Sequence, residues 1–123
     1  MRIIYDNIVF AIQKYGGVSV VWQELLQHIS QNDDFCIQYI DVDNDNPNNY
    51  SRDKLTILDK DIIRTIKYPK IERYMPVRVN VKEPFVFHSS YYRYCTNPNA
   101  INITTVHDFT YEFFVKGLRQ KVH

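Results

Sequence analysis

Two residues that could take part in acid-base chemistry stand directly behind an apolar run. The run Ile101–Val106 is followed by His107 and Asp108. A histidine changes charge near neutral pH and can hydrogen-bond a sugar hydroxyl, and a neighbouring aspartate can orient its ring. We therefore predict that His107 and Asp108 are catalytic. The alternative is a packed histidine, with Asp108 capping a turn.

A second polar cluster follows the apolar run Pro84–Phe87 and suits the binding of a sugar or a phosphate. Its candidate substrate-binding residues are His88, Ser89, Tyr91 and Arg93. Tyrosine offers an apolar ring with a polar tip, and arginine a forked donor for anions. The serines could instead form a turn and the tyrosines could be half-buried packing, and for His88 this structural interpretation is the stronger one.

A pair of glycines, Gly16 and Gly17, supplies a third candidate binding element. Glycines allow a ligand to approach the backbone closely, and the N-terminus of a following helix favours phosphate. The pair is not a dinucleotide-binding fingerprint, because "GGVSVV" lacks the third glycine, and no GK[ST] follows as in a P-loop. A tight loop without a ligand remains the alternative.

The acidic stretch "DVDND" (41–45) invites comparison with metal-binding motifs. A calcium loop starting there would need glycine at position 46 and glutamate at position 52, where the chain has Asn46 and Arg52. We therefore expect a solvated acidic turn, no metal site and no cofactor. The sequence also contains no nucleophile elbow and no HExxH, so nucleophilic hydrolysis is not supported.

The elements that must position these residues follow an alternating pattern. Strands are predicted at 2–5, 35–42, 84–87 and 101–106, the last of them buried. Apolar residues at spacings of three and four predict a helix from Val18 to about Ser30, and the first forty residues therefore form a βαβ unit with parallel strands. Leu55, Leu58, Ile62 and Ile66 fit a second helix, although "LTIL" could equally be a strand. Residues 43–51 form a polar loop, and 111–123 a loop entering a helix.

Composition limits the class of protein. The chain has 123 residues, 45% of them hydrophobic, which suits a single domain spanning 1–123. A net charge of +1 gives no footprint for nucleic acid. Cys36 and Cys95 form no pairing framework and fit reduced thiols in a cytoplasm. We expect neither a signal peptide nor a membrane span.

The predicted fold class is α/β, a Rossmann-like three-layer domain with a mostly parallel sheet. In such a sheet the carboxyl ends of the strands share one edge, and ligands bind in the crevice outside it. The glycine pair and the residues after the strands at 84–87 and 101–106 all belong to this edge. The strand at 101–106, taken as central, would thus deliver His107 to a cleft.

Three patches of the chain resemble a known family. "GGVSVVWQEL" is similar to a Gly-Gly-x-Ser-x-x-x-x-Glu-Leu start, "TTVHDF" to a His-Asp at a strand end, and "FVFHSSYYR" stands in the corresponding order between them. The chain in outline resembles the N-terminal domain of GT-B glycosyltransferases, specifically the retaining family four. These nucleotide-sugar-dependent enzymes act in bacterial polysaccharide and lipopolysaccharide assembly.

The resemblance implies roles for individual residues and for a missing part. Gly16 and Gly17 would lie against the donor diphosphate or the acceptor, and His107 would contact the donor sugar. In that family a C-terminal domain holds the donor nucleotide with a basic pair and two glutamates eight positions apart. No two of the chain's glutamates show that spacing: Glu24, Glu72, Glu83 and Glu112.

The chain is therefore expected to be the acceptor-side half of an enzyme and inactive alone. Its partners would be a nucleotide-sugar donor, a saccharide or lipid-linked acceptor and the C-terminal domain, with peripheral association of the full-length enzyme with the inner face of the membrane. The alternatives are a non-catalytic α/β binding or interaction module, in which the tyrosines form a protein interface, and a different nucleotide-binding enzyme.

Overall fold

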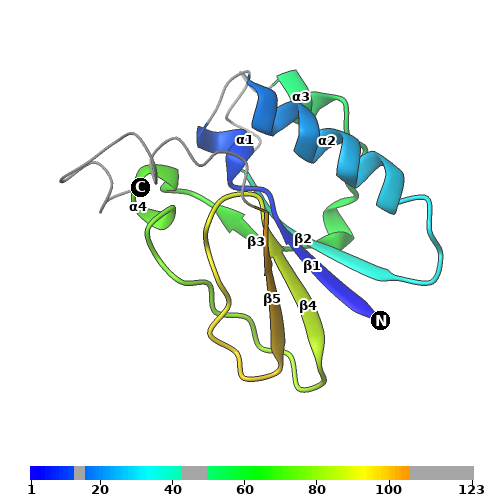
Figure 1. Ribbon diagram of the computed structural model, residues 1–123, viewed down its shortest axis with the longest axis vertical. Coiled ribbons are helices and arrows are strands. Elements are labelled where there is room, and N and C mark those ends of the chain that lie inside the picture. Colours follow the sequence, from blue (N-terminus) through cyan, green and yellow to red (C-terminus); the bar gives the residue numbers. More distant parts are fainter. Residues whose placement is uncertain (13–15, 43–49, 106–123) are drawn as a thin grey trace.

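A computed structural model describes residues 1–12, 16–42 and 50–105 of the chain (Figure 1). Four helices, one turn of 3-10 helix (η1) and five strands make up this part. In chain order they are β1 (Arg2–Asp6), α1 (Val9–Ile12), α2 (Gly17–Ile29), β2 (Cys36–Val42), α3 (Tyr50–Asp53), η1 (Asp59–Asp61), β3 (Ile62–Ile66), α4 (Pro69–Glu72), β4 (Phe85–Ser89) and β5 (Ala100–Thr104).

All five strands pair in parallel in one sheet with the order β3-β2-β1-β4-β5 (Figure 1). β1 lies in the middle, and its Ile4, which pairs with Gln38 of β2 and Phe87 of β4, is fully buried. Apolar strands that are covered on both faces are typical of parallel sheets. The predicted Rossmann-like α/β fold and the predicted parallel βαβ unit at the N-terminus are both confirmed.

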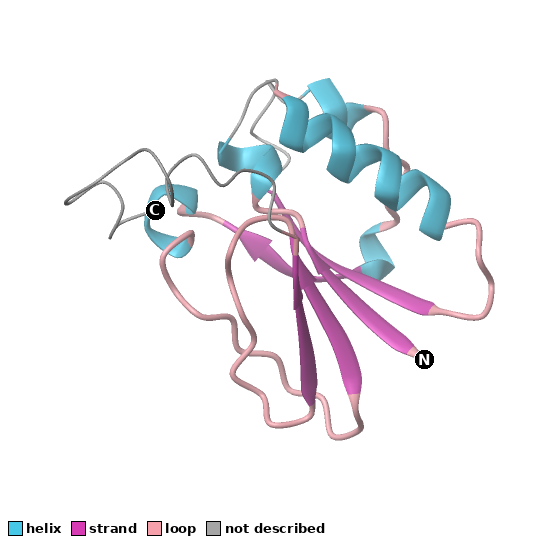
Figure 2. Ribbon diagram, viewed as in Figure 1, coloured by secondary structure: helices cyan, strands magenta, loops and turns pink. Residues whose placement is uncertain are grey.

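Helix α2 packs along one face of the sheet (Figure 2). Trp22 and Leu26 point to the sheet and are buried, and the Trp22 ring meets the Tyr5 ring of β1 edge to face at 5.6 Å. The predicted helix is confirmed, but its apolar stripe is narrower than expected, because Val21 is 54% exposed. The side chains of α2 that pack on the sheet therefore lie on one narrow face of the helix.

The opposite face is covered by an extended segment rather than by a long helix. Along residues 77–81, Val77 and Val81 are buried while Arg78 and Asn80 are exposed. This alternation is typical of a strand with one covered face. The segment is held by hydrogen bonds from the Asn97 amide to the carbonyl oxygens of Val79 and Val81, both at 2.8 Å.

The helix predicted over 55–66 is wrong. Residues 55–58 have no regular structure, η1 follows, and 62–66 form strand β3. The spacing of the apolar residues fits a helix, but "IIRTI" is rich in β-branched residues that pack well on a pleated surface. Pairing with β2 supplies the backbone hydrogen bonds that a short isolated helix would lack.

The expectation of a buried, central last strand is also wrong for the described part of the chain. β5 is the outer strand of the described sheet, and its Ile101 and Ile103 are 57% and 42% exposed. Both side chains share the α2 face of the sheet, since they pair with Val86 and His88 of β4. An apolar run predicts a strand, but it does not indicate which element covers it.

The remaining sequence predictions concern the segment after β1, the polar loop, the C-terminal helix and a membrane span. The short helix α1, between the first strand and the glycine pair, was not predicted. The polar loop lies mostly outside the described residues, as does the helix at 111–123. Within the described ranges, no helix combines the length and the apolar character needed to cross a membrane.

Candidate functional site

A buried ion pair joins the carboxyl ends of β1 and β4. The Arg93 guanidinium donates from Nη2 to Asp6 Oδ1 at 2.6 Å and from Nε to Asp6 Oδ2 at 2.8 Å. The side chains are 4% and 0% exposed. Ser89 Oγ donates to the same Asp6 Oδ2 at 2.8 Å. The carboxylate is therefore held in one orientation by three charge-assisted hydrogen bonds.

A second buried network joins β1, β2 and α2. Asn7 accepts a hydrogen bond on Oδ1 from Trp22 Nε1 at 2.9 Å and donates from Nδ2 to Asp41 Oδ1 at 3.3 Å. Asp41 is also ion-paired with Arg52 of α3, Nη2 to Oδ2 at 2.6 Å. Asn7 uses both ends of its amide, so it fixes α2 against the edge of the sheet.

Ser90 ties the start of α1 to the end of β4. Its Oγ accepts a hydrogen bond from the backbone N–H of Val9 at 2.9 Å, and its own N–H donates to the Asp6 carbonyl at 3.0 Å. The first N–H groups of a helix have no partner within the helix, so a side-chain acceptor here stabilises α1. The loops at this edge are thus built as one connected polar framework.

His88 lies at the same edge, half-buried between aromatic rings. Its ring centre is 4.9 Å from that of Trp22, edge to face, and 5.8 Å from that of Tyr5. Nε2 lies 2.8 Å from Oγ1 of Thr105, directly after β5. Packing therefore fixes the imidazole plane, while the Nε2 edge is turned toward the end of β5.

The two tyrosines of the neighbouring strands remain protonated at neutral pH. Burial raises the pKa of Tyr5 above its ordinary value. Burial also raises the pKa of Tyr39 to about 12, and the charges of Tyr5, Asp61 and Asp41 add to this rise while Arg52 opposes it. Neither phenol can act as a base at neutral pH.

Tyr91, two residues after the end of β4, is in contact with Arg73. The Arg73 guanidinium carbon is 4.7 Å from the centre of the Tyr91 ring and 5.1 Å from that of the Tyr74 ring. Arg73 Nη2 also donates to the Tyr91 hydroxyl. A guanidinium on aromatic faces is a stable, partly desolvated arrangement. Tyr91 is therefore held in place by a cation on its own chain.

The glycine pair begins α2. Gly16 has an extended backbone, and Gly17 is the first helical residue. Among the described residues no side chain caps this helix N-terminus, and a Cβ placed on Gly17 would meet no described atom within 4 Å apart from its chain neighbours and its own helix backbone. The Cβ direction of Gly17 is thus unobstructed, and a helix start without a side-chain cap is the kind of backbone to which phosphate binds.

The predicted site residues divide into three groups. His88, Ser89, Tyr91 and Arg93 are brought to one edge; of these, Ser89 and Arg93 have their hydrogen-bonding groups directed to Asp6 and other chain atoms. Gly16 and Gly17 lie at the start of α2. His107 and Asp108 lie outside the described residues, so their catalytic role stays a prediction, as does substrate binding by the other six.

Sequence reasoning missed Asp6, Asn7 and Trp22, which organise the edge. A signal for Asp6 and Asn7 was present in the sequence. They follow the apolar run of the first strand, just as His88 and Ser89 follow the apolar run 84–87. Within the described ranges, no group of three or more His, Cys, Asp or Glu side chains could hold a metal ion. Asp41, from the stretch once compared with metal motifs, is paired with Arg52, and positions 43–45 are outside the described residues.

Comparisons with known proteins give no further assignment. No model of a protein family matches this chain, and neither a curated protein nor a solved structure matches it.

Proposed function

We propose that this chain is the N-terminal, acceptor-side domain of a retaining glycosyltransferase of the GT-B type. The enzyme would transfer a sugar from a nucleotide-sugar to a saccharide or lipid-linked acceptor in cell-surface polysaccharide or lipopolysaccharide synthesis. It would act in the cytoplasm, at or near the inner face of the membrane. The C-terminal domain that holds the donor would complete the site.

One observation carries the proposal: the motif patches meet the carboxyl edge of an all-parallel sheet. Gly17 begins α2, His88 stands on β4, and the patch that contains His107 begins in sequence at Thr104, the last residue of β5. The His88–Trp22 contact at 4.9 Å and the His88–Thr105 contact at 2.8 Å connect these three elements. Ligands of open α/β sheets bind at such an edge.

The chemistry of retaining transfer suits what this edge offers. The leaving diphosphate needs stabilisation by N–H groups and cations, and the acceptor hydroxyl needs positioning in a dry cleft. The first turn of α2, which no side chain of the described residues caps, would offer N–H groups, and the fixed imidazole of His88 offers a hydrogen-bonding group at the same edge. The Asp6–Arg93 network would keep the loops in place while ligands exchange.

The cheapest test is to determine the coding sequence beyond the codon for His123. We expect about 150 further residues, a domain's worth, that contain two glutamates eight positions apart. A stop codon directly after His123 would contradict the proposal. It would instead favour the second candidate.

The second candidate is a non-catalytic interaction module. It is favoured by an exposed cluster of large side chains around α4 and the segment before β5, namely Tyr68, Ile71, Tyr74, Met75 and Tyr94. Aromatic residues of this kind are enriched at protein interfaces. Loss of partner capture after Tyr74→Ser together with Tyr94→Ser, in a protein without transferase activity, would favour this candidate.

A further inference from the structure

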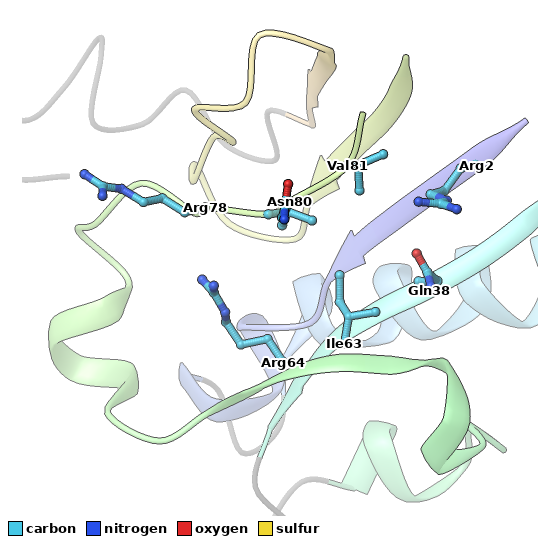
Figure 3. Close-up of a pocket in the computed structure, with 8 residues that line it drawn as sticks. Arg2, Gln38, Ile63, Arg64, Arg78, Asn80 and Val81 are labelled. Atoms are coloured by element: carbon cyan, nitrogen blue, oxygen red, sulfur yellow. The ribbon is translucent and has the colours of Figure 1, made fainter. Parts of the chain in front are cut away.

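A pocket of about 260 Å³ lies on the face of the sheet opposite to α2 (Figure 3). It is an open hollow between strands β1 to β3 on one side and the extended segment 78–81 on the other. The side chains that line it and that could contact a ligand include Arg2, Gln38, Ile63, Arg64, Arg78 and Asn80. The pocket is near the amino-terminal halves of the strands, whereas Asp6 and His88 lie at the carboxyl edge. It is therefore separate from the site described above.

The local sequence explains how the cations reach this pocket. Between Tyr39 and Ile40 of β2 the pairing with β3 shifts from Ile62 to Arg64, so Ile63 is an extra residue on β3. A bulge of this kind redirects the side chains around it. Ile63 and Arg64, although consecutive, both line the pocket as a result.

All the charged side chains that line the pocket are positive. Three arginines line it and no carboxylate does. Arg2 forms an ion pair with Glu83 at 3.1 Å, and the Glu83 side chain is 58% exposed. In the part of the chain that the structure describes, neither Arg64 nor Arg78 forms an ion pair. The pocket thus has two cations without an internal counter-ion.

The arrangement of donors also limits the ligand. In Figure 3, Arg2 and Gln38 lie together at one end of the hollow, Arg64 reaches up from the other end, and Asn80 lies across from Ile63, while Arg78 extends outward. Guanidinium groups match the oxygens of phosphate with paired donors, and side-chain amides add single donors. Ile63 and the neighbouring valines would contact an apolar part of the same molecule.

We propose that this pocket binds the phosphate or diphosphate group of a small molecule, with Arg64 and Arg2 as its main cationic ligands. The group would lie between the two guanidinium groups and would be helped by Gln38 and Asn80. Binding there does not depend on the proposed glycosyltransferase activity. It requires only the described sheet and the segment 78–81.

The first test is calorimetric titration of the purified protein with sodium pyrophosphate at low ionic strength. We expect saturable binding with a dissociation constant of about 1 mM or tighter. Arg64→Gln should weaken it about tenfold, the effect of losing a charge-assisted hydrogen bond. Lys70→Gln removes the same charge from α4 outside the pocket and should change the constant less than twofold, because distant surface charges are screened.

Two results would overturn the proposal. One is the absence of binding up to about 10 mM pyrophosphate. The other is equal weakening by Arg64→Gln and Lys70→Gln, which would indicate a general charge effect. Arg64 is exposed, so Arg64→Gln should melt at the temperature of the parent protein, and a melting scan confirms that the comparison is between folded proteins.

Glu83 provides a test with the opposite sign. Glu83→Gln frees Arg2 from its ion pair and should tighten pyrophosphate binding about twofold to threefold, as expected for a partly exposed pair. Unchanged or weaker binding would contradict the assignment of Arg2. Flotation with phosphatidylcholine vesicles that contain phosphatidic acid separates the two sources of phosphate. Arg64-dependent flotation would assign a lipid headgroup, and pyrophosphate binding without flotation would assign a soluble ester.

Discussion

Arg93 and Asp6 form a two-pronged ion pair that is closed off from solvent at the carboxyl edge of the sheet. Arg93 follows β4 in sequence and Asp6 ends β1, so the pair joins segments 87 positions apart. Ser89 completes the coordination of the carboxylate. The loops between β1 and β4 that would form the floor of the ligand site thus depend on neutralisation of the buried Asp6 carboxylate.

We expect Arg93→Ala to lower the free energy of unfolding by about 3–5 kcal/mol, because it leaves the Asp6 carboxylate buried and unpaired. Urea denaturation followed by circular dichroism measures the change. Arg78→Ala, which removes an exposed arginine, should cost less than about 0.5 kcal/mol. Similar small losses in both variants would show that Asp6 finds other partners.

Tyr39 should make the protein sensitive to alkali. Its pKa is about 12 in the folded protein, against about 10 in an unfolded chain. Its contribution to stability is therefore fully present below pH 10 and is lost as the pH rises through 12. Urea unfolding at a series of pH values from 9 to 12 should show a loss that is about 2 kcal/mol smaller in Tyr39→Phe. Tyr68→Phe, at an exposed ring, should leave the loss unchanged, and identical curves for Tyr39→Phe and the parent would contradict the assignment.

Gly17 can be tested for a role in binding separately from a role in folding. A Cβ at this position meets open space, so Gly17→Ala should fold at least as well as the parent and gain up to about 1 kcal/mol. Gly17→Val in the full-length protein should impair transfer more than folding, because its methyl groups would obstruct the approach of a phosphate to the first turn of α2. Wild-type activity and melting temperature in both variants would reduce the pair to an ordinary loop.

His107 should act in the transition state more than in binding. We expect His107→Ala in the full-length protein to lower kcat by roughly 10²-fold, with little change in thermal stability, because the imidazole would orient the donor sugar toward the acceptor. Steady-state kinetics and a melting scan together measure this. An earlier melting transition with normal activity per folded molecule would identify His107 as a core histidine.

The fold could be predicted because its strongest signals are local. The stripe of Val18, Trp22, Leu25 and Leu26 and the compact apolar runs around it define a βαβ unit, and parallel pairing follows from the crossover helix. At 62–66 the same logic failed, since apolar spacing alone did not separate a helix from a strand that pairs with β2. The exposure of β5 could not be predicted from local sequence either, because the burial of a strand depends on which distant segments pack against it.

The sequence predicted the location of the candidate site, at the carboxyl edge of the sheet, but not the contacts within it. Parallel strands bring their carboxyl ends together, so the sequence indicated that His88 and Ser89 would stand at this edge, where β4 ends. The partners of Arg93 and Trp22 could not be predicted, because Asp6 and Asn7 reach them across 87 and 15 positions of sequence. Such pairings depend on the order of strands in the sheet, which no local pattern in this chain indicates.

The most direct test of the proposed function is a transfer assay on the protein encoded by the complete reading frame. Each common nucleotide-diphosphate sugar is incubated with the protein and with lipid-linked saccharides from the cells that make it, and the product is analysed by NMR. We predict sugar transfer with the anomeric configuration of the donor retained, and no transfer by residues 1–123 alone. Transfer with inversion, turnover by residues 1–123 alone, or an absence of transfer from every donor would contradict the proposal.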